Sequence, residues 1–205
     1  MKDNRTREQI MTVIREALVD NGTTSSGDLN VNFNFNVNEN EDLSVIFAQT
    51  FCKNGGSMFY CYNEKDIGKH IVEIQQQHGD VTIGCASENL ASFMGHLGIE
   101  NRCLCDISKR YTLGASLCES LIAWRGGIVI SSNQGLGTTI PSLPDTTIVL
   151  AFTSQVVIDW EMAFERMKNF YNNTPDNIIM INPASYVYRK GLQKLYLILI
   201  EDENT

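Results

Sequence analysis

The stretch Thr147-Ile148-Val149-Leu150-Ala151-Phe152 is an almost unbroken apolar run with the length of one strand. It is followed by a helical stretch, Asp159 to Tyr171, in which apolar residues recur at the spacing of one helical face. A strand without polar alternation is typical of a parallel sheet that is buried on both faces. The stretch therefore predicts an α/β fold with a mostly parallel sheet flanked by helices.

The same alternation of short apolar runs and helical stretches extends in both directions from this run. Ser87 is placed to cap the helix that Gly98 ends, and Gly79 is placed to end the helix before it. The expected strands are residues 58–62, 81–83, 102–105, 128–131, 147–152, 178–181 and 195–200. The expected helices contain Leu43 to Phe51, Ile67 to Ile74, Leu90 to Leu97, Ala115 to Trp124 and Asp159 to Tyr171. Six or seven strands alternating with helices predict one α/β domain, residues 41–205.

The first 40 residues do not follow this alternation. Thr6 and Gln9 have the spacing of a capping box, and residues 1–22 are expected to form an N-terminal helix. Residues 23–40 are expected to form an asparagine-rich linker or arm, in which asparagine alternates with valine and phenylalanine from Asn30 to Asn38, a period of two. This period favours an ordered, extended arm, with a flexible linker as the alternative.

The charge of the chain excludes several classes of partner. The 205 residues include 16 basic and 24 acidic side chains, which give a formal net charge of -8. Duplex nucleic acids and anionic membranes attract basic surfaces, so neither is an expected partner. No apolar run approaches the ~18 residues of a membrane-spanning helix. The polar N-terminus lacks an apolar signal core, which favours a cytoplasmic location.

The six cysteines show no pattern of metal ligands. Cys103 and Cys105 share one face of a predicted strand, but no second pair and no histidine cluster complete a metal site. A catalytic cysteine would need a nearby histidine, and the three histidines fall on predicted amphipathic helices. We therefore expect buried thiols that pack as small apolar groups, with no metal and no cofactor.

Three segments follow predicted strands, at the positions where open α/β sheets bind ligands. The candidate ligand-binding residues on these segments are Ser131, Gly135, Gly137, Thr138, Thr153, Ser154, Asn182 and Ser185. Glycines allow close approach of the backbone, and hydroxyl and amide groups can hold a carboxylate or a phosphate. If the segments converge on one edge of the sheet, they form a pocket for a small anion. The alternative is that these residues form ordinary tight turns and helix caps.

No residue is identified as catalytic. An enzyme of the transferase or isomerase type would need a carboxylate positioned at the end of a strand. Glu119 falls within a predicted helix and Asp145 within a turn. Independent catalytic activity is therefore not expected.

The order of these segments resembles the LUD (lactate-utilisation) domain family, and in particular its C-type members. The residues that carry the resemblance are Arg7-Glu8-Gln9-Ile10, Phe47-Ala48-Gln49 with Gly55-Gly56, Gly126 before Ile128-Val129-Ile130, Leu143-Pro144-Asp145, Gln155-Val156-Val157 and Pro183. The resemblance covers nearly the whole chain except the asparagine-rich arm. It implies a fold similar to the NagB/RpiA/CoA-transferase type.

The resemblance implies an accessory protein of L-lactate or related organic-acid utilisation. Such a protein would bind a small anionic metabolite or dock on an iron-sulfur lactate-oxidising complex. The chain has Trp124-Arg125-Gly126-Gly127 where the family reads acid-Thr-Gly-Thr, and it keeps only the proline of a later family motif at residues 182–190. These departures favour a second hypothesis, a diverged scaffold or interaction protein that keeps the fold without the pocket. The arm would then add a strand to a partner or to a second copy in a homo-oligomer.

Overall fold

The computed structural model describes residues 2–20, 42–103, 112–134, 144, 146–171, 174–187 and 194–202. The helices are α1 (Lys2–Asp20), α2 (Leu43–Lys53), α3 (Glu64–Gln77), α4 (Glu88–His96), α5 (Trp160–Phe170) and α6 (Pro183–Val187). Short 3-10 helices are η1 (Ala123–Arg125), η2 (Ser132–Gln134) and η4 (Thr153–Gln155). The strands are β1 (Ser57–Cys61), β2 (Ile83–Cys85), β3 (Asn101–Cys103), β4 (Leu113–Leu117), β5 (Ser120–Ile122), β6 (Gly127–Ser131), β7 (Thr146–Phe152), β8 (Val156–Val157), β9 (Ile178–Ile181) and β10 (Lys194–Ile200).

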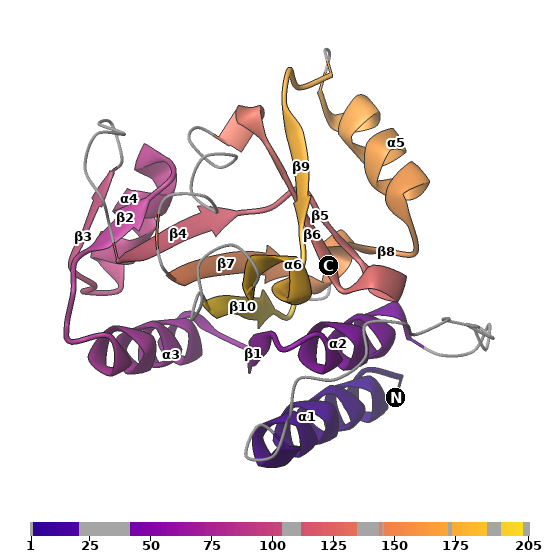
Figure 1. Cartoon of the computed structure of the whole chain (residues 1–205), viewed down its shortest axis with the longest axis horizontal. Helices are drawn as coiled ribbons and strands as arrows, with labels where there is room; N and C mark the ends of the chain where they lie inside the picture. Colours follow the sequence, from indigo (N-terminus) through magenta and orange to yellow (C-terminus); the bar gives the residue numbers. More distant parts are fainter. Residues whose placement is uncertain are drawn as a thin grey trace.

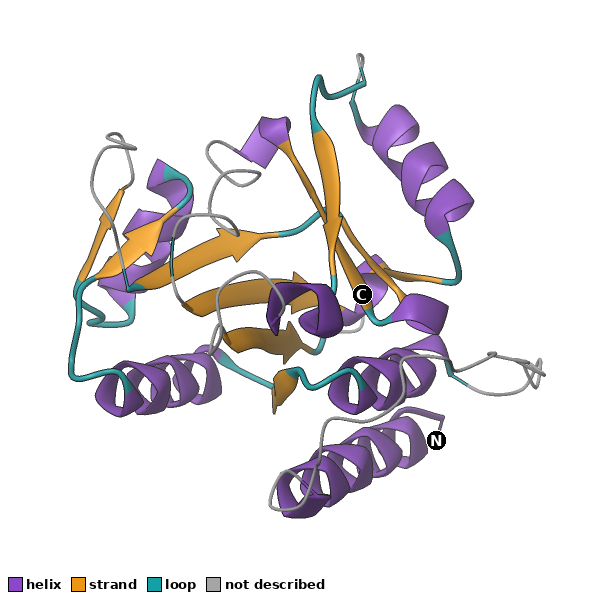
Figure 2. Ribbon diagram, in the orientation of Figure 1, coloured by secondary structure: helices purple, strands orange, loops and turns teal. Residues whose placement is uncertain are grey.

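A six-stranded sheet with the order β1-β10-β7-β4-β2-β3 forms the centre of the molecule (Figure 1). Every pair of neighbours in this sheet is parallel. Helices lie around the sheet, as the colouring by secondary structure shows (Figure 2). The predicted α/β class with a mostly parallel sheet is therefore confirmed.

A second, four-stranded sheet with the order β8-β5-β6-β9 lies beside the first. In it β6 is antiparallel to both β5 and β9. The helix predicted over residues 115–124 is wrong, because this segment contains part of β4, then β5 and η1. Residues 113–116 are all buried, and burial on every side removes the alternation that distinguishes a strand from a buried helix.

The six-stranded sheet separates two hydrophobic cores. On one face, α1 and α2 pack with Val149 and Ala151 of β7, and the second sheet contributes to the same core. On the other face, α3 and α4 pack with Ile148 and Leu150 of the same strand. A third core lies between the second sheet and Ala163 and Met167 of α5. Alternate residues of β7 thus belong to different cores, as the period of two in a strand requires.

The N-terminal helix is present as predicted, and α1 packs on α2 through residues that include Ile10 and Ile14. The predicted arm, residues 23–40, lies outside the described residues. Within the described ranges, no helix combines the length and the apolar composition that crossing a membrane requires.

Four of the five thiols that the structure describes are buried, as the sequence predicts, whereas Cys103 is only half-buried. Cys52, Cys61, Cys85 and Cys118 are buried and free, and they pack in the cores. Burial raises the pKa of Cys52 to about 11 and that of Cys85 to about 12. These thiols are therefore protonated near neutral pH and behave as small apolar groups.

Candidate functional site

Two cavities lie at the carboxyl edge of the six-stranded sheet, where parallel sheets place their ligands. They flank η4, the short helix that follows β7. Thr153 and Ser154 of η4 line one cavity, and Gln155 lines the other. The two cavities differ in charge, and this difference decides what each can bind.

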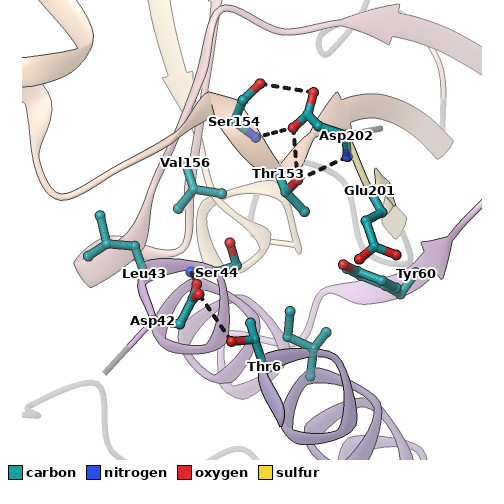
Figure 3. A pocket seen from close by; sticks show the side chains of 11 residues that line it. Thr6, Asp42, Leu43, Ser44, Tyr60, Thr153, Ser154, Val156, Glu201 and Asp202 are labelled. Atoms are coloured by element: carbon teal, nitrogen blue, oxygen red, sulfur yellow. Dashed lines mark hydrogen bonds between the residues drawn. The ribbon is translucent and has the colours of Figure 1, made fainter. Parts of the chain in front are cut away.

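The first, which we call the acidic cavity, has a volume of about 500 Å³ and is shown in Figure 3. Its walls are the start of α2, part of α1, and the segments after β7 and β10, and they carry the carboxylates of Asp42, Glu201 and Asp202. None of the described residues that line it is a lysine, an arginine or a histidine. The pKa of the Tyr60 phenol, which lines the cavity, is raised by burial and by the charge of Glu201.

The Asp202 carboxylate binds the hydroxyl and N–H groups of Thr153 and Ser154, which the sequence predicted to bind an anionic ligand (Figure 3). Its carboxylate accepts hydrogen bonds from the Thr153 hydroxyl at 2.8 Å, the Ser154 backbone N–H at 2.5 Å and the Ser154 hydroxyl at 3.1 Å. The chain thus supplies its own carboxylate to Thr153 and Ser154. With two further carboxylates in its walls, this cavity disfavours an anionic ligand.

The second, which we call the Glu119 cavity, has a volume of about 210 Å³. It lies between the carboxyl ends of β4 and β7 on one side and α5 on the other. Its lining residues are Leu117, Cys118, Glu119, Gln134, Leu150, Phe152, Gln155, Arg166, Met167, Phe170 and Tyr171. It therefore combines apolar walls with a few polar groups, as small-molecule sites commonly do.

Glu119 lies in the two-residue connection between β4 and β5, so its expected position within a helix is wrong. Its carboxylate accepts a hydrogen bond from the hydroxyl of Ser131, at the end of β6. The Tyr171 hydroxyl donates to both carboxylate oxygens, at 3.1 and 3.2 Å. Burial and the negative charge of Glu119 raise the pKa of Tyr171 to about 12. Tyr171 is therefore a proton donor at neutral pH, and three elements fix one carboxylate at a strand end.

Arg166 of α5 is the cationic residue in the lining of the Glu119 cavity. Its Nη1 donates to the backbone carbonyl of Ser154 at 2.5 Å. Arg166 and Glu119, both described, form no ion pair with each other. Both charges nevertheless act on the Cys118 thiol: Glu119 raises its pKa and Arg166 lowers it, beside the larger effect of burial. Opposite charges thus line one small cavity without neutralising each other directly.

The two glutamines that line the Glu119 cavity, Gln134 and Gln155, differ in their hydrogen bonds. Gln155 donates to the Cys118 carbonyl at 2.6 Å and accepts from the Phe152 backbone N–H at 2.7 Å. Oε1 of Gln134 is buried and has no hydrogen-bond partner among the described residues. A buried acceptor without a donor is costly, so Gln134 is an acceptor that a ligand can satisfy.

The structure places the predicted site residues in three different settings. Ser131 lies against Glu119, and Thr153 and Ser154 lie in the acidic cavity. Asn182 and Ser185 bond to each other at the start of α6, with the Ser185 N–H donating to Asn182 Oδ1 at 2.7 Å, which is the capping alternative. Gly135, Gly137 and Thr138 lie outside the described residues.

The expected convergence of the three segments does not hold for Ser131 and Asn182. The antiparallel pairing of β6 and β9 puts Ser131 opposite Ile178, and Ile128 opposite Ile181. Asn182 therefore follows the opposite end of the strand pair. The expectation assumed that both strands run parallel, and the pairing direction reverses one of them.

Sequence reasoning missed Tyr171 and Arg166 and rejected Glu119. Arg166 lies in α5, which was correctly predicted as helical, and Tyr171 is the residue after its end, but nothing in the pattern indicates that they meet Ser154 and Glu119. A strand assignment for the small and apolar residues before Glu119 would have placed that carboxylate at a strand end. Within the described ranges, no group of three or more His, Cys, Asp or Glu side chains could hold a metal ion.

The chain is similar to known proteins in both sequence and fold. A family model described as the LUD domain matches residues 5–194. Among solved structures, the crystal structure of a DUF162 family protein from Deinococcus radiodurans is similar, with a TM-score of 0.62 at 14% sequence identity. The similarity covers 77% of this chain and 96% of that one, and at this identity it shows the fold alone. No curated protein matches the chain.

Proposed function

Because the chain belongs to the LUD domain family, we propose that it is an accessory protein of L-lactate or related organic-acid utilisation. In this proposal it binds a small organic anion in the Glu119 cavity. Docking on an iron-sulfur lactate-oxidising complex is the second part of the same proposal, because an accessory protein acts beside a catalyst.

The observation that supports binding there is the position of Arg166. A guanidinium group presents five N–H donors in a planar fork, which suits a carboxylate. One donor group of Arg166 is used by the Ser154 carbonyl, which leaves others for a ligand. The acidic cavity lacks such a group in its described lining. Of the two cavities at this edge, the one with Arg166 is therefore the better site for an anion.

The size of the Glu119 cavity agrees with a small metabolite. Its volume of about 210 Å³ is below the roughly 300 Å³ at which sites for drug-sized ligands begin. An acid of three or four carbon atoms fits within such a cavity. The apolar side chains of Leu117, Leu150 and Met167 would face its methyl or methylene groups.

The first test measures the melting temperature with L-lactate, pyruvate and succinate. A ligand that binds only the folded state at about 100 times its Kd stabilises it by about 2.7 kcal/mol. We expect the increase in Tm to be lost in Arg166→Gln. Lys168→Gln is the matched control, because it removes an exposed cation from the same helix outside the cavity. An equal increase in Arg166→Gln would contradict binding at this site.

A diverged scaffold or interaction protein is the alternative, and an apolar surface favours it. Phe170 is 79% exposed, and Phe152 and Met162 are exposed near it, on or beside α5. Exposed apolar groups of this size are typical of contacts with other proteins or with a second copy. This alternative predicts that none of the acids changes the Tm of the wild-type protein.

A further inference from the structure

We infer that the Glu119 cavity selects carboxylic acids that carry a hydrogen-bond donor, a hydroxyl or an amine, on the carbon next to the carboxyl group. It disfavours the 2-oxo acids of the same carbon skeleton. The inference rests on the proposed function, since it takes the carboxylate of the ligand to bind Arg166. It adds the identity of the group on the neighbouring carbon.

The acceptors of the cavity carry this inference. Oε1 of Glu119 accepts from both Ser131 and Tyr171, whereas Oε2 accepts only the longer, shared bond from Tyr171 at 3.2 Å. Oε2 is therefore the carboxylate oxygen with free acceptor capacity. Oε1 of Gln134 is a second acceptor, buried and without a donor among the described residues. The cavity thus contains one acceptor with unused capacity, Glu119 Oε2, and one acceptor without a donor among the described residues, Gln134 Oε1.

A ligand with a donor would satisfy these acceptors, and an oxo group would not. A hydrogen bond to a charged group is stronger than one between neutral groups, and a buried acceptor left unpaired is unfavourable. The oxygen of a 2-oxo acid only accepts, so it would face the Glu119 carboxylate with no proton between the two oxygens. The hydroxyl of a 2-hydroxy acid or the ammonium of a 2-amino acid supplies that proton.

The charges set the orientation of the ligand. Arg166 and Glu119 line the same cavity and form no ion pair, so neither satisfies the other. A carboxylate beside Glu119 would be repelled, and beside Arg166 it is attracted. The carboxyl group is thus directed to α5, and the substituent on the neighbouring carbon to the end of β4.

Glu119 is held in position for this role. Ser131, which is fully buried, reaches it from the second sheet, and Tyr171 reaches it from the end of α5. These bonds restrict the rotation of the Glu119 side chain before a ligand enters. A preorganised acceptor loses less entropy on binding than a mobile one.

The experiment measures the affinities of L-lactate, L-alanine and pyruvate by calorimetry on the full chain. The three share one carbon skeleton and differ in the group on the second carbon. We expect L-lactate or L-alanine to bind about tenfold to about a hundredfold more tightly than pyruvate. The wild-type series tests the inference without a variant.

The variant Glu119→Gln then tests whether Glu119 causes the preference. A glutamine amide can donate to an oxo group, and we expect the preference over pyruvate to fall below about threefold. Glu165→Gln is the matched control, because it removes an exposed carboxylate of α5 that does not line the cavity. It should keep the wild-type preference. Circular dichroism shows whether both variants are folded.

The outcomes separate the inference from the proposed function. Pyruvate binding as tightly as L-lactate and L-alanine, or a Glu119→Gln preference equal to that of the wild type, overturns the inference and leaves anion binding intact. Binding of L-alanine without L-lactate supports the inference and argues against lactate as the ligand. Binding of none of the three overturns both the inference and the proposed site.

Discussion

Gly126 is constrained both by its backbone conformation and by the residues packed against it. Its φ of 57° lies in the left-handed region, and it ends η1 immediately before β6. A Cβ atom there would lie 2.7 Å from the Phe51 backbone nitrogen and 2.8 Å from the Phe51 Cα. Both the backbone angle and the contact with α2 therefore require glycine.

We expect Gly126→Ala to lower the free energy of unfolding by about 2–4 kcal/mol, because it adds a clash with backbone atoms to the left-handed strain. Gly79→Ala is the control, since Gly79 has a φ of 84° but no atom within 4 Å of the added Cβ. It should cost only about 1–2 kcal/mol. Urea denaturation measures the free energy of unfolding of both variants. Equal losses would show that the backbone near Phe51 shifts to accept the added Cβ without a measurable penalty.

Single residues also show why the candidate site was only partly predictable from the sequence. Ser131, Thr153 and Ser154 were predicted because they follow strands, a local property. Their partners Glu119 and Asp202 are 12 and 48 or 49 residues away. A sequence pattern indicates a hydroxyl at a strand end, but the charge that meets it depends on the tertiary fold.

At the scale of the element, α2 has a cap that also joins it to α1. The Asp42 carboxylate accepts from the Ser44 backbone N–H at 2.9 Å through Oδ1 and from the Thr6 hydroxyl at 3.2 Å through Oδ2. A side chain at this position satisfies one of the free N–H groups of the first helical turn. Thr6 therefore connects α1 to α2, although its spacing to Gln9 suggested a cap for α1 itself.

Asp42→Ala is expected to lower the free energy of unfolding by about 1–2 kcal/mol, because it removes the cap and the bond to α1. Thr6→Val removes only the bond to α1 and should cost less, about 0.5 kcal/mol. Thermal denaturation followed by circular dichroism compares the two variants. If Thr6→Val costs as much as Asp42→Ala, the cap contributes nothing measurable.

The elements also show which sequence signals were reliable. The strands of the parallel sheet near 147–152 and 195–200 were predicted because they are long apolar runs. Helices α3, α4 and α5 were predicted because apolar residues recur there at helical spacing, with Ser87 as the expected cap of α4, which the structure confirms. The residues around β4 and β5 were misassigned because buried small residues suit a helix equally well. The second sheet was not predicted, because the pairing of β6 with β9 is set by contacts between distant segments.

At the scale of the whole molecule, β7 connects the two cores on either face of the sheet. Ile148, fully buried, belongs to the core of α3 and α4, and Val149, fully buried, belongs to the core of α1 and α2. Adjacent residues of one strand thus pack in the two cores on opposite faces of the sheet. This arrangement predicts that the halves unfold together.

Ile148→Ala should lower the free energy of unfolding by about 2–5 kcal/mol, and Val149→Ala somewhat less, because each leaves a cavity in its core. Both variants should keep one transition in which far-ultraviolet circular dichroism and tryptophan fluorescence coincide. Trp124 packs against the third core, and Trp160 is the first residue of α5. Tryptophan fluorescence therefore reports the region around α5 and the second sheet, whereas circular dichroism reports the helices of the whole molecule. Separate transitions in either variant would show that the cores are independent.

The position of β10 has a consequence for synthesis on the ribosome. In the sheet, β1 pairs with β10, so Ser57 meets Tyr196 across 139 residues of chain. When β1 leaves the ribosome, the strand that completes it has not yet been translated. Its apolar residues Met58 and Tyr60 therefore stay without their strand partner until β10 has been synthesised. Because β10 also pairs with β7, a nascent chain that stalls before residue 194 leaves one edge of β7 unpaired as well.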